Sequence, residues 1–278
     1  MTNTYILTLS CPDQRGIVHA VTGFLLSKNA NIGEAAQYND TVTGLFFMRV
    51  CFVGEAIMHT DFEQLAQQYA MKWQIRPSAD KMPTLIMVSK LGHCLHDLLL
   101  RYRSGLLPID IRAIVSNHRD FYQLAATYNI PFYHIPVTPE TKIAAEAELL
   151  GLIRKEGAEL VVLARYMQVL SDAACKELDG KAINIHHSFL PSFKGARPYF
   201  QAYDRGVKLI GATAHYVTGD LDEGPIIEQD IARVDHAMDA QALTNIGRDV
   251  ESGVLARAVA WHAQHRILRN GHKTVVFK

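Results

Sequence analysis

The pattern of apolar and polar positions in the first 77 residues predicts a small mixed α/β unit. Apolar residues between Ile17 and Leu25 recur at intervals of three and four, which is typical of one face of an amphipathic helix. The other expected elements are strands at 5–9, 31–39, 45–53 and 73–76, and a helix at 62–69. The order strand–helix–strand–strand–helix–strand is that of a ferredoxin-like split βαβ unit.

A linker is predicted over 77–83, where Pro77 and Pro83 bracket small and charged residues. Such a segment favours neither helix nor strand. We therefore expect an N-terminal domain of residues 1–82 and a second domain of residues 83–278.

In the second domain the pattern changes to strands that alternate with helices. Strands are expected at 85–88, 109–115, 132–137, 160–163, 183–186, 209–217 and 225–230, and helices at 94–102, 141–155 and 239–263. Leu160–Leu163 is apolar at every position, as in a strand buried on both faces of a parallel sheet. The prediction is an α/β fold with a mostly parallel, doubly wound sheet, helices on both faces and right-handed crossovers.

Composition mainly excludes classes of function. The sequence is 49% hydrophobic, which argues against disorder. It has 28 Lys and Arg against 28 Asp and Glu, so it lacks the positive charge typical of a nucleic-acid partner. No apolar run is long enough for a membrane span, and the N-terminus lacks the basic region of a signal peptide. Cys11, Cys51, Cys94 and Cys175 are far apart, so we expect reduced thiols in a cytoplasmic protein.

Candidate chemistry is expected at the carboxyl ends of the strands, where ligands bind in such sheets. Since side chains alternate along a strand, Asn184 and His186 are predicted to share one face and His187 to lie on the other. An amide N–H can stabilise an oxyanion, and an imidazole can move a proton near neutral pH. The pair suits acyl chemistry, although an arbitrary Asn-x-His is more often a hydrogen-bonded strand end.

The segment 218–225 holds three acidic residues and two glycines ahead of an apolar strand. Taken alone it is typical of a solvated turn. A carboxylate brought from it to His186 would orient the ring or activate water.

Other reactive patterns are incomplete. His93 and His96 lie three residues apart, but no carboxylate or cysteine completes a metal-ligand pattern, so no metal is expected. Ser188 lacks the G-x-S-x-G motif of a serine nucleophile. The Ser89–Cys94 turn could bind an anion at a helix N-terminus, but its single glycine is a poor phosphate signal.

Several motifs within residues 84–278 resemble those of the folate-dependent formyltransferases. They are the run Asn184–Pro191, Phe193–Gly195, Asp222 ahead of Gly224–Ile227, Ala164–Ser171 and Gly211–Tyr216. The resemblance implies that Asn184, His186 and Asp222 are catalytic, with Ser188 and His215 supporting them. It also implies folate binding by Arg165, Tyr166, Met167, Gln168, Val169, Leu170, Gly219, Asp220 and Leu221. No cofactor beyond the folate itself is implied.

Within that superfamily the chain most closely resembles the formyltetrahydrofolate deformylases. This implies hydrolysis of 10-formyltetrahydrofolate to formate and tetrahydrofolate in one-carbon and purine metabolism. His187 stands where glycinamide-ribonucleotide transformylases usually carry Pro. The Ser89–Cys94 turn replaces the glycine-rich loop with which those enzymes hold the acceptor's phosphate.

The N-terminal domain resembles an ACT domain, which implies a homo-oligomer and a small amino-acid effector. The effector residues implied are Asp13, Gly16, Asn31 and Ile32. Gln14-Arg15 stands where family members often have Arg-Pro, which leaves the effector's identity open.

Two alternatives remain at this level. One is formyl transfer to an amine acceptor, as in glycinamide-ribonucleotide transformylases, with the same three catalytic residues. The other is a non-catalytic folate or amino-acid sensor. A methionyl-tRNA formyltransferase would need a basic tRNA-binding extension, which a chain of zero net charge does not show.

Overall fold

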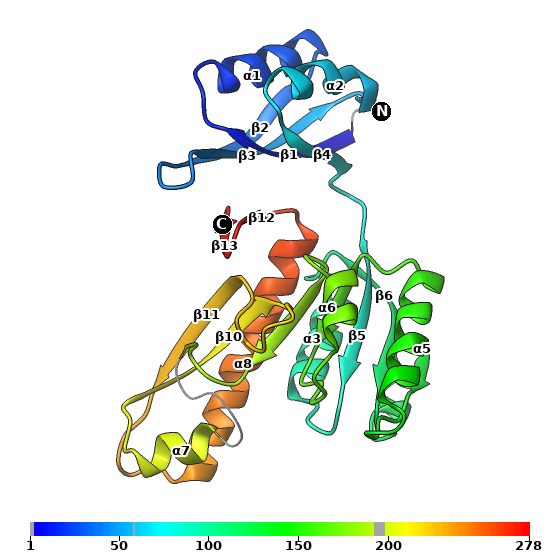
Figure 1. Cartoon of the computed structure of the whole chain (residues 1–278), viewed down its shortest axis with the longest axis vertical. Helices are drawn as coiled ribbons and strands as arrows, with labels where there is room; N and C mark the ends of the chain where they lie inside the picture. Colours follow the sequence, from blue (N-terminus) through cyan, green and yellow to red (C-terminus); the bar gives the residue numbers. More distant parts are fainter. Residues whose placement is uncertain (1–2, 58, 192–197) are drawn as a thin grey trace. The chain divides into compact units, whose positions relative to one another are not determined.

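The chain divides into two compact units in the computed structural model, which describes residues 3–57, 59–191 and 198–278. One unit comprises Met1–Asp80 together with Gln264–Lys278, and the other comprises Lys81–Ala263 (Figure 1).

The first unit has the predicted ferredoxin-like order. Its elements are β1 (Asn3–Pro12), α1 (Ile17–Ser27), β2 (Asn31–Asp40), β3 (Leu45–Gly54), α2 (His59–Gln68) and β4 (Lys72–Pro77). The antiparallel sheet has the strand order β2-β3-β1-β4. Ile17, Val21 and Leu25 of α1 point into the core, as their spacing predicts. Both helices therefore bury their apolar faces against this sheet.

A C-terminal hairpin, β12 (Ile267–Asn270) and β13 (Lys273–Val276), belongs to this unit. Asn270 Nδ2 donates to Asp40 Oδ2 at 2.6 Å, and Arg266 Nη1 lies 3.2 Å from Glu34 Oε1. Buried Arg49 reaches the carbonyl oxygen of Gln264 at 3.3 Å. The sequence placed residues 264–278 in the second domain. The structure differs because their polar partners lie on β2 and β3.

The second unit is built on a seven-stranded sheet. Its strands are β5 (Met82–Val88), β6 (Ile109–Ser116), β7 (Phe132–His134), β8 (Leu160–Leu163), β9 (Ala182–His186), β10 (Leu209–Tyr216) and β11 (Ile226–Arg233). Its helices are α3 (His93–Arg103), α4 (Tyr122–Thr127), α5 (Lys142–Lys155), α6 (Asp172–Glu177), α7 (Pro198–Asp204) and α8 (Ala240–Ala263). The strand order is β11-β10-β9-β8-β5-β6-β7, and only the pairings of β10 are antiparallel among its described pairs.

Helices cover both faces of this sheet. Leu85 and Met87 of β5 share a core cluster with residues of α5 and α6. Ile86 alternates to the opposite face and is equally buried. On the other side of the sheet α8 packs against β9, β10, β11 and α3. All four residues of β8 are buried, which confirms the prediction of a central parallel strand.

The structure corrects the predicted elements in two places. The irregular stretch between the units is shorter than 77–83, because β4 includes Pro77 and β5 begins at Met82. Pro83 is accommodated near the start of β5, where its carbonyl accepts from Glu159 N at 2.8 Å. The short helices α4, α6 and α7 and the C-terminal hairpin were not predicted.

The sequence also led us to expect reduced cysteines and no membrane-spanning helix. Cys11, Cys51, Cys94 and Cys175 are all unpaired, as expected. Across the described residues, no helix combines the length and the hydropathy that a membrane span requires.

Candidate active site

A cavity of about 540 Å³ lies in the second unit at the carboxyl ends of β8 and β9. Most of the predicted site residues line it. They are Arg165, Tyr166, Met167, Gln168, Val169, Leu170, Asn184, His186, His215, Gly219, Asp220, Leu221 and Asp222. Segments that are distant in the chain therefore meet at one place, the edge of the sheet where ligands bind in this class of fold.

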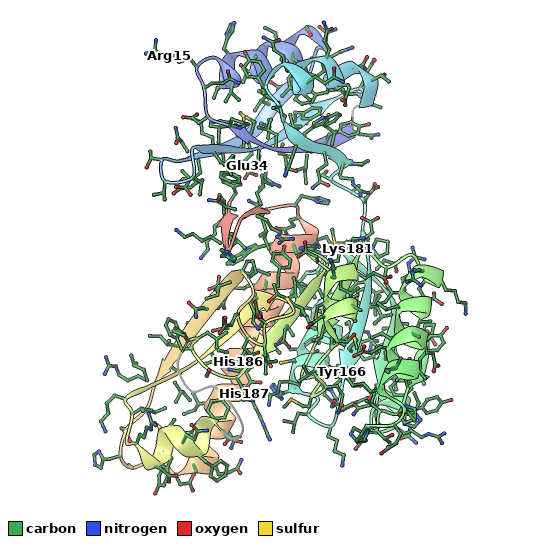
Figure 2. The ribbon with its side chains drawn as sticks, viewed as in Figure 1. Arg15, Glu34, Tyr166, Lys181, His186 and His187 are labelled. Carbon is green, nitrogen blue, oxygen red and sulfur yellow. The ribbon has the colours of Figure 1, made fainter. Side chains whose placement is uncertain are left out.

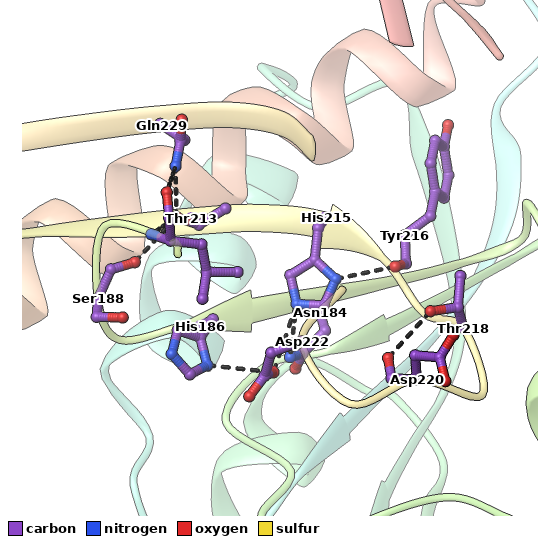
Figure 3. A network of polar contacts seen from close by, with 11 residues as sticks. Asn184, His186, Ser188, Thr213, His215, Tyr216, Thr218, Asp220, Asp222 and Gln229 are labelled. Atoms are coloured by element: carbon purple, nitrogen blue, oxygen red, sulfur yellow. Dashed lines mark hydrogen bonds and ion pairs between the residues drawn. The ribbon is translucent and has the colours of Figure 1, made fainter. Parts of the chain in front are cut away.

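Asp222 lies between two histidine rings (Figure 3). Its Oδ1 is 3.2 Å from His186 Nδ1 and 3.7 Å from His215 Nε2. Burial alone would raise the pKa of Asp222, but hydrogen bonds from His186 and His215 outweigh it and hold that pKa well below its usual range. The carboxylate is therefore ionised at neutral pH, and can orient His186 or accept a proton from it.

Asn184 and His215 face each other across the β9–β10 pair. Asn184 Nδ2 lies 3.3 Å from His215 Nε2, and His215 Nδ1 donates to the carbonyl oxygen of Tyr216 at 2.9 Å. A side-chain amide has two N–H donors, so one contact with His215 leaves Asn184 able to donate to a substrate oxygen.

The loop that carries Asp222 is held by a close backbone approach. Tyr216 N donates to the carbonyl oxygen of Pro225 at 3.0 Å, which joins the two ends of the loop. A Cβ at Gly224 would lie 1.7 Å from the carbonyl oxygen of Tyr216, so only glycine fits there. Asp222 itself has a positive φ of 57°, a left-handed conformation that Asp adopts more readily than most residues.

The segment 165–170 is anchored to the end of β5. Ser89 Oγ accepts from Met167 N at 2.9 Å and donates to Asn117 Oδ1 at 2.7 Å. Ser89 N donates to the carbonyl oxygen of Arg165 at 3.2 Å. Ser89 thus holds the start of a segment that lines the cavity, so we assign it a structural role at this strand-to-helix turn.

His187 does not lie on the opposite face from His186. β9 ends at His186, and the chain bends through the next two residues. Thr213 Oγ1 secures this bend, donating to the carbonyl oxygen of Ser188 at 2.9 Å and accepting from Leu190 N at 3.1 Å (Figure 3). The two imidazoles stack with centroids 5.0 Å apart and an interplanar angle of 29°, and both line the cavity. Figure 2 labels both residues in the second unit. The strand alternation that predicted opposite faces does not continue past the last strand residue.

A second polar group, which the sequence did not reveal, lines the same cavity. We call it the Glu251 cluster; its members are His93, Arg165, His187, Tyr199 and Glu251. Glu251 on α8 is 1% exposed and accepts from His93 Nε2 at 2.7 Å and from Tyr199 Oη at 2.6 Å, with Arg165 Nε 3.4 Å away.

The charge states within the cluster differ. Burial would raise the pKa of Glu251, but the hydrogen bond from His93 and the charge of Arg165 hold it below its ordinary value. Burial lowers the pKa of His187 to about 4, and the charges of Arg165 and His186 act in the same direction. At neutral pH the cluster therefore combines an ionised Glu251 with an uncharged His187.

A sequence signal for this cluster did exist. Glu251 is an acidic residue on the buried face of α8, in register with Leu243, Gly247 and Leu255. A single charge at a core position of a helix is buried only when it is paired, which makes it a functional or structural candidate.

His93, Cys94 and Glu251 could also be considered as metal ligands, since their ligand atoms lie within 4.8 Å of one another. Burial raises the pKa of the Cys94 thiol, which disfavours the thiolate that a metal needs. Hydrogen bonds already satisfy Glu251, and the cation Arg165 lies beside it. That the reaction needs no metal or added cofactor stays a prediction.

Some predicted residues lie elsewhere. Ser188 is buried in the bend after β9 and is not part of the cavity lining. The motif residues 193–195 fall outside the part of the chain that the structure describes. In the first unit, Asp13 N bonds to the carbonyl of Gly44, beside the carboxyl end of β2, whereas Asn31 begins that strand. The two halves of the predicted effector site are thus roughly 25 Å apart along β2 within one chain.

Comparison with known proteins gives the family. The model of the family described as formyl transferase matches residues 82–259. A formyltetrahydrofolate deformylase from Corynebacterium sp. (strain P-1) is 52% identical, over 99% of this chain and 98% of its own length. The chain belongs to the formyltetrahydrofolate deformylase family.

Solved structures show the same relation at the level of the fold. A formyltetrahydrofolate deformylase from Burkholderia mallei is similar with a TM-score of 0.96 at 51% identity, covering 99% of this chain and 100% of that one. A glycinamide ribonucleotide transformylase 1 from Symbiobacterium toebii has a TM-score of 0.67 at 27% identity, covering 72% of this chain and 95% of its own. The deformylase relatives thus match both units, whereas the transformylase covers a smaller part of the chain.

Proposed function

We propose that the protein hydrolyses 10-formyltetrahydrofolate to formate and tetrahydrofolate. The observation that carries the proposal is the ionised Asp222 held 3.2 Å from His186 Nδ1, with Asn184 beside them in the cavity. The deformylase relatives, which match over the whole chain, supply the reaction. We further propose that the enzyme acts in one-carbon and purine metabolism in the cytoplasm.

The N10-formyl group is an amide, so water must attack its carbonyl carbon. In the proposed mechanism Asn184 and protonated His186 stabilise the oxyanion that forms. Asp222 keeps the His186 ring oriented, or takes the proton of the attacking water. Breaking the bond from carbon to N10 transfers one proton to N10, so tetrahydrofolate leaves as the amine and the formyl carbon leaves as formate.

The folate is proposed to lie between segments 165–170 and 219–222, which both line the cavity. Exposed Met167, Val169 and Leu221 offer apolar surface there to a flat heteroaromatic ring. Backbone groups of the anchored segment 165–170 supply hydrogen-bonding partners for the ring's polar edge.

The test is release of formate from 10-formyltetrahydrofolate by the purified protein, with and without an added amine acceptor. Turnover that needs no acceptor is expected. Formate release that depends strictly on glycinamide ribonucleotide would contradict hydrolysis. Tight folate binding without turnover would contradict catalysis of either kind. Activity that persists after dialysis against EDTA is expected, because no metal takes part in the proposed steps.

We also propose that the first unit acts as an ACT-type regulatory domain in a homo-oligomer. Its support is the ferredoxin-like fold, in which Asp13 lies beside the carboxyl end of β2, Gly16 precedes α1, and Asn31 and Ile32 begin β2. Two chains would have to combine to join these residues into one amino-acid site. Light scattering should give a mass above that of one chain, and a monomer at micromolar concentration would contradict the pairing.

A further inference from the structure

The Glu251 cluster lies beside the proposed catalytic histidine, yet the proposed hydrolysis gives it no task. His187 connects the two, because its ring stacks on His186 at 5.0 Å and lies 6.4 Å from the ring of Tyr199. The uncharged ring of His187 therefore forms a wall of the cavity next to the reacting centre.

This wall is held firmly from behind. Tyr199 Oη donates to the ionised Glu251 at 2.6 Å, and a bond to a charged acceptor is stronger than one between neutral groups. Gly247, one turn before Glu251 in α8, lets Tyr199 approach the helix closely, since a Cβ there would lie 2.1 Å from Tyr199 Cζ. Tyr199 is already in contact with the helix and cannot move further back to make room for His187.

We infer that the Glu251 cluster makes the site selective for water as the nucleophile. Its side chains line the cavity beside His186, and there they restrict the approach to the formyl carbon of an amine, which is larger than water. The inference rests on the proposed hydrolysis and names the feature that restricts it to water.

Water and an amine react with the formyl group by the same kind of steps, so the shape of the cavity must select between them. Attack by water forms a carbon–oxygen bond, breaks the bond from carbon to N10 and sends one proton to N10, which gives formate. Attack by an amine forms a carbon–nitrogen bond, breaks the same bond and also sends one proton to N10, which gives a formamide. Asn184, His186 and Asp222 would serve both reactions equally well. A solved transformylase shares the fold, so the fold alone does not exclude an amine.

The experiment supplies a choice of nucleophile to the full-length protein. Wild type, His187→Ala and Tyr199→Phe are incubated with 10-formyltetrahydrofolate and glycinamide, and N-formylglycinamide and formate are measured together by mass spectrometry. Exposed His236, changed to Ala, is the matched control. His187→Ser is the second variant if His187→Ala melts well below wild type.

Removing the His187 ring should raise the ratio of N-formylglycinamide to formate by about tenfold or more, the discrimination that small differences in pocket shape give. Tyr199→Phe removes the hydrogen bond to Glu251 that holds the wall from behind, so it should raise the ratio, but by less than His187→Ala. The control His236→Ala should leave the ratio within about twofold of wild type. A purely structural role for His187 would lower both products together and leave their ratio unchanged.

Two results would overturn the inference: wild type that already forms as much N-formylglycinamide as His187→Ala, or His187 variants that fold and release formate but never form the amide. Absence of formate from wild type in the absence of amine would instead overturn the proposed hydrolysis. The product ratio and the incubation of wild type without amine separate these two failures.

Discussion

At the scale of residues, the site depends on how burial and hydrogen bonds set the charge of a few side chains. Asp222 and Glu251 are both largely buried, yet donors around them hold the pKa of each below its ordinary value. For His187, burial and the charges of Arg165 and His186 outweigh the opposing effect of Glu251, and the pKa falls to about 4. The immediate contacts of each group therefore explain why Asp222 and Glu251 stay ionised while the nearby His187 stays neutral.

Asp222→Asn should lower kcat by about 10²–10⁴, because it removes one preorganised charged group from the reacting centre. Tetrahydrofolate binding should change little, since the proposed folate contacts come from segment 165–170 and from Leu221 rather than from the carboxylate of Asp222. The measurements are steady-state formate release and a fluorescence titration with tetrahydrofolate. Asp249→Asn is the matched control, because Asp249 is an exposed residue on α8. A kcat within threefold of wild type would remove Asp222 from the mechanism.

His187 should make the stability of the protein depend on pH. The unfolded chain binds a proton at this residue near pH 6.5, whereas the folded protein resists it down to about pH 4. The unfolded state binds more protons between these values, so stability falls as the pH falls through that window, by about 3 kcal/mol for the full shift.

His187→Asn cannot titrate and should flatten this part of the profile. The measurement is the thermal unfolding of the second unit in wild type and in His187→Asn, at pH values from 7 to 4. His236→Asn, at an exposed position, should keep the wild-type slope. An unchanged slope in His187→Asn would show that other groups cause the pH dependence.

At the scale of elements, the strands and long helices followed from the sequence, whereas the short elements did not. β8 is apolar throughout, which predicts a buried strand, and the apolar residues of α1 have the helical period, which predicts an amphipathic helix. The helices α4, α6 and α7 have six or seven residues, too few for a period to be read. Their existence depends on tertiary packing more than on local preference.

The loop between β10 and β11 should depend on Gly224. Gly224→Ala would place a Cβ 1.7 Å from the carbonyl oxygen of Tyr216, so the backbone must move and carry Asp222 with it. We expect loss of most formate release and a lower melting temperature.

Gly151→Ala is the matched control for this prediction. Gly151 lies in α5 with nothing within 4 Å of an added Cβ. The change should stabilise the helix by roughly 0.5–1 kcal/mol and leave activity intact. Equal effects of the two substitutions would contradict the role assigned to Gly224.

At the scale of the whole molecule, the chain crosses between its two units twice. The first crossing lies near residue 80 and the second at the end of α8, after which the C-terminal hairpin belongs to the first unit. The contacts from Gln264, Arg266 and Asn270 reach residues of β2 and β3. Dividing the chain only at the predicted linker would therefore separate the C-terminal hairpin from the rest of the first unit.

A chain of residues 81–263 should fold cooperatively and release formate. A chain of residues 83–278 should aggregate or unfold at a lower temperature, because its last 15 residues lose the sheet on which they pack. Circular dichroism melts and formate release on both chains are the measurements. Equal stability and solubility of the two chains would contradict this prediction, because they would show that the hairpin without its sheet does not harm the second unit.

The sequence by itself determined the two kinds of sheet, the order of their main elements and the segments that form the cavity. Those features are encoded locally, by the period of apolar residues and by motifs a few residues long. Only the tertiary structure decided that His187 lies beside His186, that Glu251 joins Tyr199 and His93, and that the C-terminal hairpin belongs to the first unit. Each of these depends on where one strand ends or on a contact between residues far apart in the chain, and no local period carries that information.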